Sequence, residues 1–453
     1  MFTTSGNRIL RDGKEFVIRG YNLGNWMMLE RFMFGFPGVD QLFRRYLKFY
    51  GGQEKHDRFF DLYYRTYFQK KDARFLKELG CNTLRIPFNY RVFEDDRKPF
   101  DFSPEAFAYI DHVIELCREQ GIAVVLDYHA AQGYQAYGHC VDNITGNMQL
   151  YYDDQCQKRF AALWKFVAEH YRNNDNVIGY DIMNEPTPAP DAYEALRRCY
   201  RLAVEAIRSV DKDHIIFIEG TGASYDFTEV EERFDENMAF TPHIYFMHPR
   251  FFEPQDREVR RKLLIDEIDR QNEAARRLNV PIWYGETGVS VGPVERPRLD
   301  YLDLSLEAFN ERGYGWTIWT YKDLWRMGLV STAEDCEWRK KTRRFIELKK
   351  KYNLDVTMYG EWDHLQMFYD DIDQDFDHTP GEFGYQRSRA DQVKNMLWTN
   401  VVNAIGQELA PEYAKLFAAQ PVEELEKMVK SFDLDQCRVK QDWYDVIYKR
   451  IRE

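Results

Sequence analysis

Two glutamates in this sequence lie where catalytic carboxyl groups are expected. Glu185 follows the apolar segment 177–184, and Glu286 ends the apolar segment 281–286. An unpaired carboxylate beside buried chain is costly, although either glutamate alone could be a structural salt bridge at the start of a loop. Two carboxyl groups that face each other across a pocket can do more. One can protonate a leaving oxygen while the other attacks the sugar carbon or activates water, which is the chemistry of glycoside hydrolysis.

Further polar and aromatic side chains follow other apolar segments. These candidate site residues are Arg85, His129, Asn184, His243, Tyr245 and Trp319. A guanidinium such as Arg85 is the group expected to keep a nucleophilic carboxylate ionised, whereas a general acid needs apolar surroundings or a nearby negative charge. His243 and Tyr245, two residues apart on one strand, are expected to share a face. Pro186 is expected to hold Glu185 in an extended conformation.

Most of the aromatic residues should belong to the core. The tryptophans beside predicted strand ends are the exceptions, because an exposed indole offers an apolar plate on which a sugar ring can stack. The candidate platforms are Trp26, Trp316, Trp319 and Trp325.

The elements that must position these residues read as repeated strand–helix units. The predicted strands are 15–22, 82–88, 122–129, 177–184, 215–220, 239–246, 281–286 and 313–320. Helical patterns separate most of them, which indicates a parallel sheet, and eight units favour closure into a barrel. No GxGxxG follows the first strand, so a dinucleotide-binding fold is excluded. In a barrel the carboxyl ends of the strands meet at one face, where the polar residues would gather.

Both ends of the chain add to the predicted barrel. Arg8–Leu10 and Phe16–Arg19 flank Asp12-Gly13, which is typical of a β-hairpin. We assign residues 1–325 to the barrel. Residues 326–453 would form the final barrel helix plus added helices packed on the barrel, or a small helical domain. The helices expected there are 336–352, 388–408, 421–431 and 440–452.

Composition limits the class of protein. The chain has 453 residues, and 62 basic against 75 acidic side chains give a net charge of −13. This acidic balance argues against nucleic acid as a partner. No apolar run approaches the roughly 18 residues needed to cross a bilayer, so no membrane partner is expected. Seven scattered cysteines without zinc spacing, and an N-terminus without an apolar signal region, predict a cytoplasmic protein, or a secreted one whose signal peptide has been removed.

Neither a metal nor another cofactor is predicted. The acidic stretch 371–382 partly matches a calcium-binding loop, with Asp at positions one, three and five and Glu at position twelve. Its sixth position, however, is Phe376 where the loop needs glycine, and Pro380 interrupts it. A solvated acidic loop is the preferred interpretation.

The motifs together resemble the cellulase-type family 5 glycoside hydrolases of clan A over about residues 7–325. The motifs are LRIPF with Arg85, LDYHA with His129, Asn184-Glu185-Pro186, HIY with His243 and Tyr245, YGETG with Glu286, and WTIW with Trp319. The resemblance implies a retaining enzyme on a (β/α)8 barrel whose lower end is closed by the N-terminal hairpin.

The same resemblance implies roles for single residues. Glu185 would be the acid/base and Glu286 the nucleophile, held by Arg85 and Tyr245. Asn184 would contact the sugar 2-hydroxyl. His129 and His243 would line the site, and Trp319 would form its floor.

Two departures from the family pattern refine the expected activity. The stretch Asn22–Gly38 with the insertion up to the second strand, and the helical C-terminal extension, are not typical of plain endoglucanases. Both would reshape the rim of the cleft, so we expect exo action or action on short oligosaccharides and glycosides. An endo-acting β-glucanase or mannanase, a transglycosylase, and a catalytically silent carbohydrate-binding barrel are the alternatives.

Overall fold

The computed structural model describes residues 1–245, 256–288, 296–352, 354, 365–377 and 389–453. Its centre is a parallel sheet whose strands follow one another in chain order around the ring. The strands are β4 (Arg19–Asn22), β5 (Thr83–Asn89), β6 (Ala123–Ala130), β7 (Val177–Asp181), β8 (Ile215–Ile218), β9 (Met238–Phe240), β10 (His243–Ile244), β11 (Trp283–Thr287) and β12 (Gly315–Ile318).

The sheet closes into an eight-stranded barrel, as the sequence predicts. The sixth strand is divided into β9 and β10 by Thr241 and Pro242. Its first half pairs with β8, and its second half pairs with β11. The backbone N–H of Phe240 also donates to the carbonyl of Pro281 at 2.9 Å, so hydrogen bonding continues across the division. The predicted strand at 15–22 begins only at Arg19, because Lys14–Glu15 belongs to the N-terminal hairpin.

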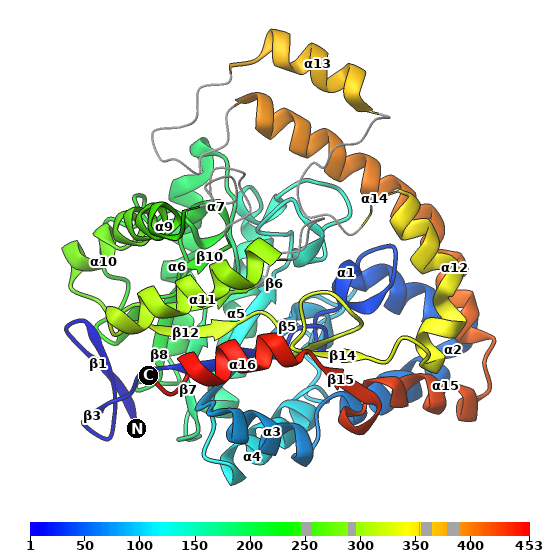
Figure 1. The fold of residues 1–453 in the computed structure, drawn as a ribbon, viewed down its shortest axis with the longest axis horizontal. Coiled ribbons are helices and arrows are strands. Elements are labelled where there is room, and N and C mark those ends of the chain that lie inside the picture. The colour runs from blue at the N-terminus through cyan, green and yellow to red at the C-terminus, as the bar shows by residue number, and fades with distance from the viewer. Residues whose placement is uncertain (246–255, 289–295, 353, 355–364, 378–388) are drawn as a thin grey trace.

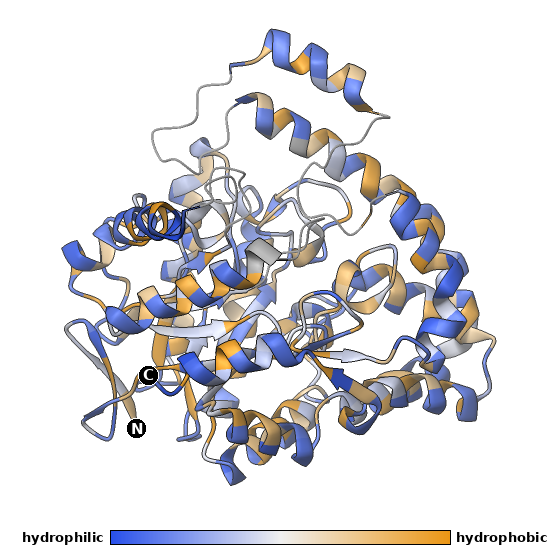
Figure 2. Cartoon of the chain, in the orientation of Figure 1, coloured by the Kyte–Doolittle hydropathy of each residue, from blue (hydrophilic) through white to orange (hydrophobic). Residues whose placement is uncertain are grey.

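Helices surround the barrel, and the larger ones are amphipathic (Figure 2). They are α1 (Arg31–Phe34), α2 (Asp40–Tyr67), α3 (Lys70–Leu79), α4 (Phe107–Glu119), α5 (Asp154–Tyr171), α6 (Tyr193–Arg208), α7 (Thr221–Ser224), α9 (Arg257–Gln271), α10 (Glu273–Leu278) and α11 (Arg296–Glu311). The long α2 occupies the insertion between the first two strands. Its backbone is kinked at Gly52, where φ is 81°.

The N-terminal strands lie against the lower end of the barrel. β1 (Phe2–Ser5), β2 (Arg8–Arg11) and β3 (Lys14–Glu15) form a small antiparallel sheet, with Asp12 and Gly13 both at positive φ in the predicted turn. Phe2 and Ile9 join an apolar cluster with residues near the beginnings of the barrel strands: Ala123, Val125, Ile178, Ile215, Phe217, Ala239 and Trp283. The lower half of the barrel is therefore filled with apolar side chains, and any site must lie at the opposite end.

The C-terminal segment is mainly helical. It contains β13 (Lys322–Asp323), β14 (Val330–Thr332), α12 (Glu337–Lys351), α13 (Gln366–Asp375), α14 (Arg389–Ala418), α15 (Val422–Val429), β15 (Cys437–Val439) and α16 (Gln441–Arg450). The three short strands form a small sheet that the sequence pattern did not indicate. Residues 371–375 of the acidic stretch are helical in α13, Phe376 and Asp377 follow the helix, and 378–382 lie outside the described residues.

The last helix of the chain occupies the place of the eighth barrel helix. α16 packs between α11 and α3 (Figure 1). The side chain of Asn310 in α11 donates to the carbonyl of Arg450 at 2.6 Å, and Arg452 donates to the carbonyl of Leu79 at the end of α3. The helices between β12 and α16 thus form an insertion within the last strand–helix unit, and α16 completes the barrel. The division of the chain into a barrel of residues 1–325 and an added segment of residues 326–453 stays a prediction.

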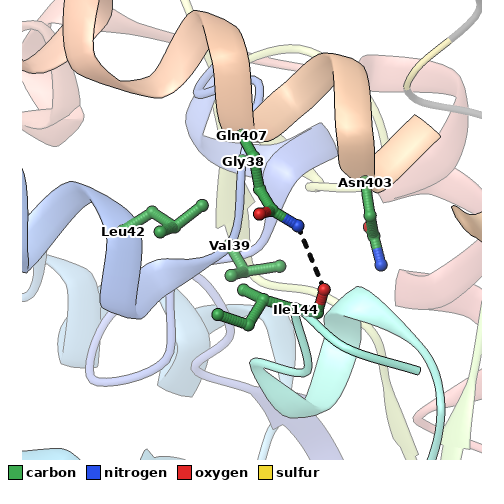
Figure 3. Close-up of a pocket in the computed structure, with 6 residues that line it drawn as sticks. All are labelled: Gly38, Val39, Leu42, Ile144, Asn403 and Gln407. Carbon is green, nitrogen blue, oxygen red and sulfur yellow. Dashed lines mark hydrogen bonds between the residues drawn. The ribbon is translucent and has the colours of Figure 1, made fainter. Parts of the chain in front are cut away.

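This insertion between β12 and α16 also covers one side of the barrel. The later part of α14 lies beside α2, while α13 stands away from the barrel at the top of Figure 1. Figure 3 shows where α14 packs against the start of α2 and the segment that contains Ile144. Gln407 Nε2 donates to the carbonyl of Ile144 there at 3.0 Å, and we call this contact the seam. The seam is lined by Gly38, Val39, Leu42, Ile144, Asn403 and Gln407. It contains none of the candidate site residues.

Candidate active site

The two glutamates lie next to each other at the upper end of the barrel. Glu286 ends β11, and Glu185 lies in the loop after β7. A carboxylate oxygen of each lies within 4.8 Å of the other and of a ring nitrogen of His243. Both are largely buried, with 19% of the Glu185 side chain and 6% of the Glu286 side chain exposed. Carboxyl groups this close fit the pair in retaining glycosidases, where about 5 Å separates the two groups, rather than the wider pair of inverting enzymes.

Glu286 is surrounded by donors that favour its ionised form. Its Oε1 accepts from Arg85 Nη1 at 2.7 Å, and its Oε2 accepts from the Tyr245 hydroxyl at 2.8 Å. Burial alone would raise the pKa of Glu286, but the charges of His243, Arg85 and His129 outweigh it and lower that pKa below its usual value. Glu286 is therefore a carboxylate that stays charged.

Glu185 has the opposite electrostatic setting. Burial raises its pKa above the usual value, and the negative charge of Glu286 adds to this increase although His243 opposes it. Its Oε1 lies 2.9 Å from His243 Nδ1. A buried carboxyl group beside a second carboxylate retains its proton more easily, as a general acid must.

The backbone at Glu185 differs from the sequence expectation. Its φ is +47°, in the left-handed region rather than the extended conformation that Pro186 was expected to impose. The N–H of Glu185 donates to Glu219 Oε2 at 2.6 Å, which fixes the peptide in this orientation. A tertiary contact thus overrides the local preference of the residue before proline.

Arg85 links the candidate site to a layer of buried acids beneath it. Besides Glu286, its guanidinium contacts Asp181 at 2.8 Å, Asp127 at 3.1 Å and Glu219 at 3.1 Å. All of these side chains are buried. Burial and the neighbouring Glu219 raise the pKa of Asp181 well above its usual value. This arrangement fixes the arginine in position under Glu286, since the N–H groups along each edge of its planar fork meet acceptors.

Sequence reasoning missed most of this layer. Asp127, Asp181 and Glu219 are not among the site residues predicted from the sequence. A signal was present, because Asp181 ends β7 and Glu219 directly follows β8. Both are acidic residues at the end of an apolar strand, the same pattern that identified Glu286.

His129 and Trp319 form one wall of the site. Their rings are stacked, with centroids 5.1 Å apart and planes 7° from parallel. His129 Nδ1 lies 2.7 Å from Asp127 Oδ2, which orients the imidazole. Asn184 accepts from Arg85 Nη2 at 2.9 Å, and its Nδ2 lies 3.5 Å from His129 Nε2. The structure therefore brings His129, Asn184 and Trp319 together.

His243 lies between three carboxyl groups. Its Nδ1 faces Glu185, and its Nε2 lies 3.3 Å from Glu219 Oε1. Although burial opposes the charged form, Glu219 and Glu286 raise the pKa of His243 well above the usual value. These carboxyl groups therefore favour the charged imidazole, which places positive charge beside Glu286.

Three of the four candidate platforms are not at the site, and for Trp26 this corrects the expectation. Trp26 is 1% exposed, packs edge-on against Tyr64 and donates its indole N–H to the Tyr64 carbonyl. Trp316 is also buried and donates to Asn310. Trp325 packs against the core beside the helices of the C-terminal segment. A position near a strand end does not reveal toward which side an indole points, so only Trp319 stays a candidate platform.

Two further residues lie beside the site although the sequence analysis did not predict them as site residues. Glu30, directly before α1, is 3% exposed, and its Oε1 lies 3.8 Å from His129 Nε2. Burial raises the pKa of the Cys140 thiol, and the negative charges of Glu185, Glu30 and Glu286 add to this increase. Glu30 lies in a loop and Cys140 in a single 3-10 turn (His139–Val141), where sequence periodicity gives no indication of direction.

The acidic clusters are already supplied with positive charge. Glu185, His243 and Glu286 could offer ligand atoms to a metal ion, as could Asp127, Asp181 and Glu219. In the first cluster the raised pKa of His243 favours the protonated imidazole, which has no lone pair for a metal. In the second, the guanidinium of Arg85 occupies the centre of the acids. The donor sets therefore favour proton transfer rather than metal binding.

Comparison with known proteins agrees with this geometry. The profile of the cellulase family (glycosyl hydrolase family 5) matches residues 48–324. The chain belongs to glycosyl hydrolase family 5. A β-xylosidase of Phanerodontia chrysosporium is 33% identical over 458 aligned positions, which cover 96% of this chain and 94% of that protein. Endoglucanase C of Acetivibrio thermocellus is 28% identical over 42% of this chain and 53% of its own length.

Solved structures show the same fold. An endogalactoceramidase structure superposes with a TM-score of 0.54 at 19% identity, covering 71% of this chain and 75% of that one. Thermotoga maritima Cel5A in complex with cellobiose gives 0.50 at 21% identity, covering 73% and 97%. Membership of family 5 makes this chain a retaining, β-specific O-glycosyl hydrolase with a carbohydrate substrate. Among the described residues, no helix has the length and apolar character to span a membrane.

Proposed function

We propose that this family 5 enzyme removes terminal sugars from short β-linked oligosaccharides and glycosides, with Glu286 as nucleophile and Glu185 as acid/base. In the first step a carboxylate oxygen of Glu286 bonds to the anomeric carbon, while Glu185 gives its proton to the departing glycosidic oxygen. In the second step Glu185 takes a proton from water. The hydroxide oxygen bonds to the anomeric carbon, and Glu286 is released as a carboxylate.

The contrast between the two carboxyl groups carries this proposal. They lie within 4.8 Å of each other, yet the pKa of Glu286 is lowered and that of Glu185 is raised. One is thus prepared to attack and the other to donate a proton. Arg85 and Tyr245 support the nucleophile, and the buried acids beneath Arg85 hold the guanidinium in place.

Exo action is supported by the chain-long similarity to a β-xylosidase, whereas the endoglucanase similarity covers less than half of the chain. The added segments also border the site. α1 follows Glu30, and Phe32 and Met33 of α1 pack with Trp319. A β-xyloside is consequently the first substrate to test, followed by β-glucosides and β-mannosides.

The mechanism is tested by trapping the intermediate. Incubation with a 2-deoxy-2-fluoro aryl β-glycoside should add one glycosyl group per chain, and peptide mass spectrometry should locate it on Glu286. Glu286→Ala should remain folded and unlabelled, with turnover abolished. A label on another residue, or a first product of inverted anomeric configuration by NMR, would contradict the assignment.

The mode of action is tested separately with polymers. Soluble xylan or β-glucan should release monosaccharide while its viscosity changes little, because terminal cleavage barely shortens the polymer. A rapid loss of viscosity ahead of reducing-sugar release would instead establish endo action.

A further inference from the structure

Glu30 occupies an unusual position for a charged residue. It directly precedes α1 and is 3% exposed. A residue at this position commonly uses its side chain to cap the helix, but the Glu30 side chain makes no capping hydrogen bond. Its backbone carbonyl accepts from Met33 and Phe34, while the carboxyl group points to the barrel site instead.

The carboxyl group of Glu30 lies beside the wall that His129 and Trp319 form. Its Oε1 is 3.8 Å from His129 Nε2, and no hydrogen-bond donor reaches this oxygen from the described part of the chain. A buried polar atom without a donor is costly, so it marks a place where a ligand can supply the missing bond.

Glu30 lies close enough to Glu185 and Glu286 for their charges to act on its carboxyl group. Burial raises the pKa of Glu30 to about 8. The charges of Glu286 and Glu185 contribute to this increase, whereas His129 and Arg31 oppose it. The group is therefore largely protonated at neutral pH, and one carboxylic acid can then both donate to and accept from a sugar hydroxyl.

We propose that Glu30 is a specificity-determining residue that hydrogen-bonds a hydroxyl of the sugar ring held between Glu185 and Glu286. The inference rests on the proposed function, since it requires that ring to be bound at the catalytic pair. Asn184 is the expected partner of the 2-hydroxyl, so Glu30 recognises the 3- or 4-hydroxyl. Such a contact anchors the terminal sugar on the side away from the scissile bond.

The test is a cycle between enzyme and substrate variants. Wild type, Glu30→Ala and Glu30→Gln are assayed on an aryl β-glycoside and on its 3-deoxy and 4-deoxy analogues. Glu30→Ala should lower kcat/KM on the parent glycoside roughly 10- to 100-fold, the value of a hydrogen bond between a polar group and a charged or strongly polar partner. On the deoxy analogue that lacks the recognised hydroxyl, the same substitution should have little effect. Glu30→Gln keeps a donor and an acceptor and should lose less than alanine.

A matched control separates recognition from general damage. Glu267, a buried glutamate of α9 that pairs with Arg270, lies on the outside of the barrel. Glu267→Gln should alter no ratio between parent and deoxy substrates. Should Glu30→Ala fail to fold, as judged by thermal unfolding, Glu30→Gln carries the test without a cavity: its smaller loss should again be confined to substrates that have the recognised hydroxyl.

The outcomes distinguish the inference from the function beneath it. Equal losses on the parent and on both deoxy analogues would overturn the role of Glu30 while leaving the proposed function intact. An inactive wild type on every aryl β-glycoside, or an active Glu286→Ala, would overturn the proposed function and this inference with it.

Discussion

At the scale of single residues, two identical side chains acquire different chemistry from their neighbours. Desolvation acts on both glutamates in the same direction. Of the two glutamates, only Glu286 contacts the guanidinium of Arg85 and the phenol of Tyr245, while Glu185 contacts His243. The balance of burial against local charge therefore separates the two pKa values, and that separation allows one to act as nucleophile and the other as acid.

The pH profile follows from the two directions. Glu286 must be ionised, so kcat/KM should fall as pH decreases through its pKa, which lies below the usual 4.5. Glu185 must be protonated, so kcat/KM should also fall as pH rises through its pKa, which lies above 4.5. The plot of kcat/KM against pH should therefore be bell-shaped, and its two limbs report the apparent pKa values of the coupled pair. The measurement is kcat/KM on an aryl β-glycoside across the range where the protein is stable.

A variant identifies the acidic limb. Tyr245→Phe removes one donor from Glu286, so the pKa of that carboxylate should increase and the acidic limb should move to higher pH. The basic limb, set by Glu185, should move much less. An unchanged acidic limb would assign it to another group.

The acid role makes a prediction about leaving groups. Glu185→Ala removes the proton donor, so substrates with poor leaving groups should lose roughly 100- to 10,000-fold in rate of glycosyl-enzyme formation. Dinitrophenyl glycosides, whose leaving group needs no proton, should lose far less in that step. The measurement is pre-steady-state release of the phenol, and equal losses for both substrates would count against Glu185.

At the scale of elements, the final helix completes the barrel. α16 covers the space between α11 and α3, and its Ile447 is fully buried there. A parallel barrel strand needs a helix on its outer face, since both of its faces are apolar. The last ten-residue helix is therefore as much a part of the barrel as the helices nearer the start of the chain.

Substitutions on the two sides of α16 should have unequal effects. Ile447→Ala leaves a cavity against the barrel and should lower the free energy of unfolding by about 2–5 kcal/mol. Lys449→Ala, at an exposed position of the same helix, should change it by about 0.5 kcal/mol or less. Urea denaturation measures both. Equal, small effects would mean that α16 does not stabilise the barrel.

At the scale of the whole molecule, a buried lysine joins distant parts of the chain. Lys322 Nζ donates to Asp72 at 2.6 Å, to the carbonyl of Tyr67 at 2.8 Å and to the carbonyl of Phe432 at 2.9 Å. The barrel, the long insertion and the C-terminal segment thus meet at one ammonium group. This junction couples the stability of all three.

Breaking the junction should be costly. Lys322→Met leaves Asp72 buried without its counter-charge and should lower the free energy of unfolding by about 3–5 kcal/mol. In Lys322→Met/Asp72→Asn the unpaired charge is gone, so part of that loss should be recovered. Thermal unfolding followed by two probes measures the change. A double variant no more stable than the single one would show that the ion pair itself is not the cause.

The sequence by itself determined the strand–helix order, the barrel and the positions at strand ends of the two glutamates proposed as the catalytic pair. These depend on local information: an apolar strand is recognisable from its composition, and a polar side chain at its end is recognisable from its position. Arg85, His129 and Tyr245 were predictable for the same reason, because each belongs to or directly follows a strand.

Only the tertiary structure decided what depends on direction and distance. It placed Trp26 in the core and Trp319 beside His129, although both follow strands. It gathered acids from three strands around Arg85, and it brought Glu30 from a loop to the catalytic pair. Contacts between residues far apart in the chain arise from packing of the whole molecule, and no local pattern encodes which side of the backbone such a residue will face.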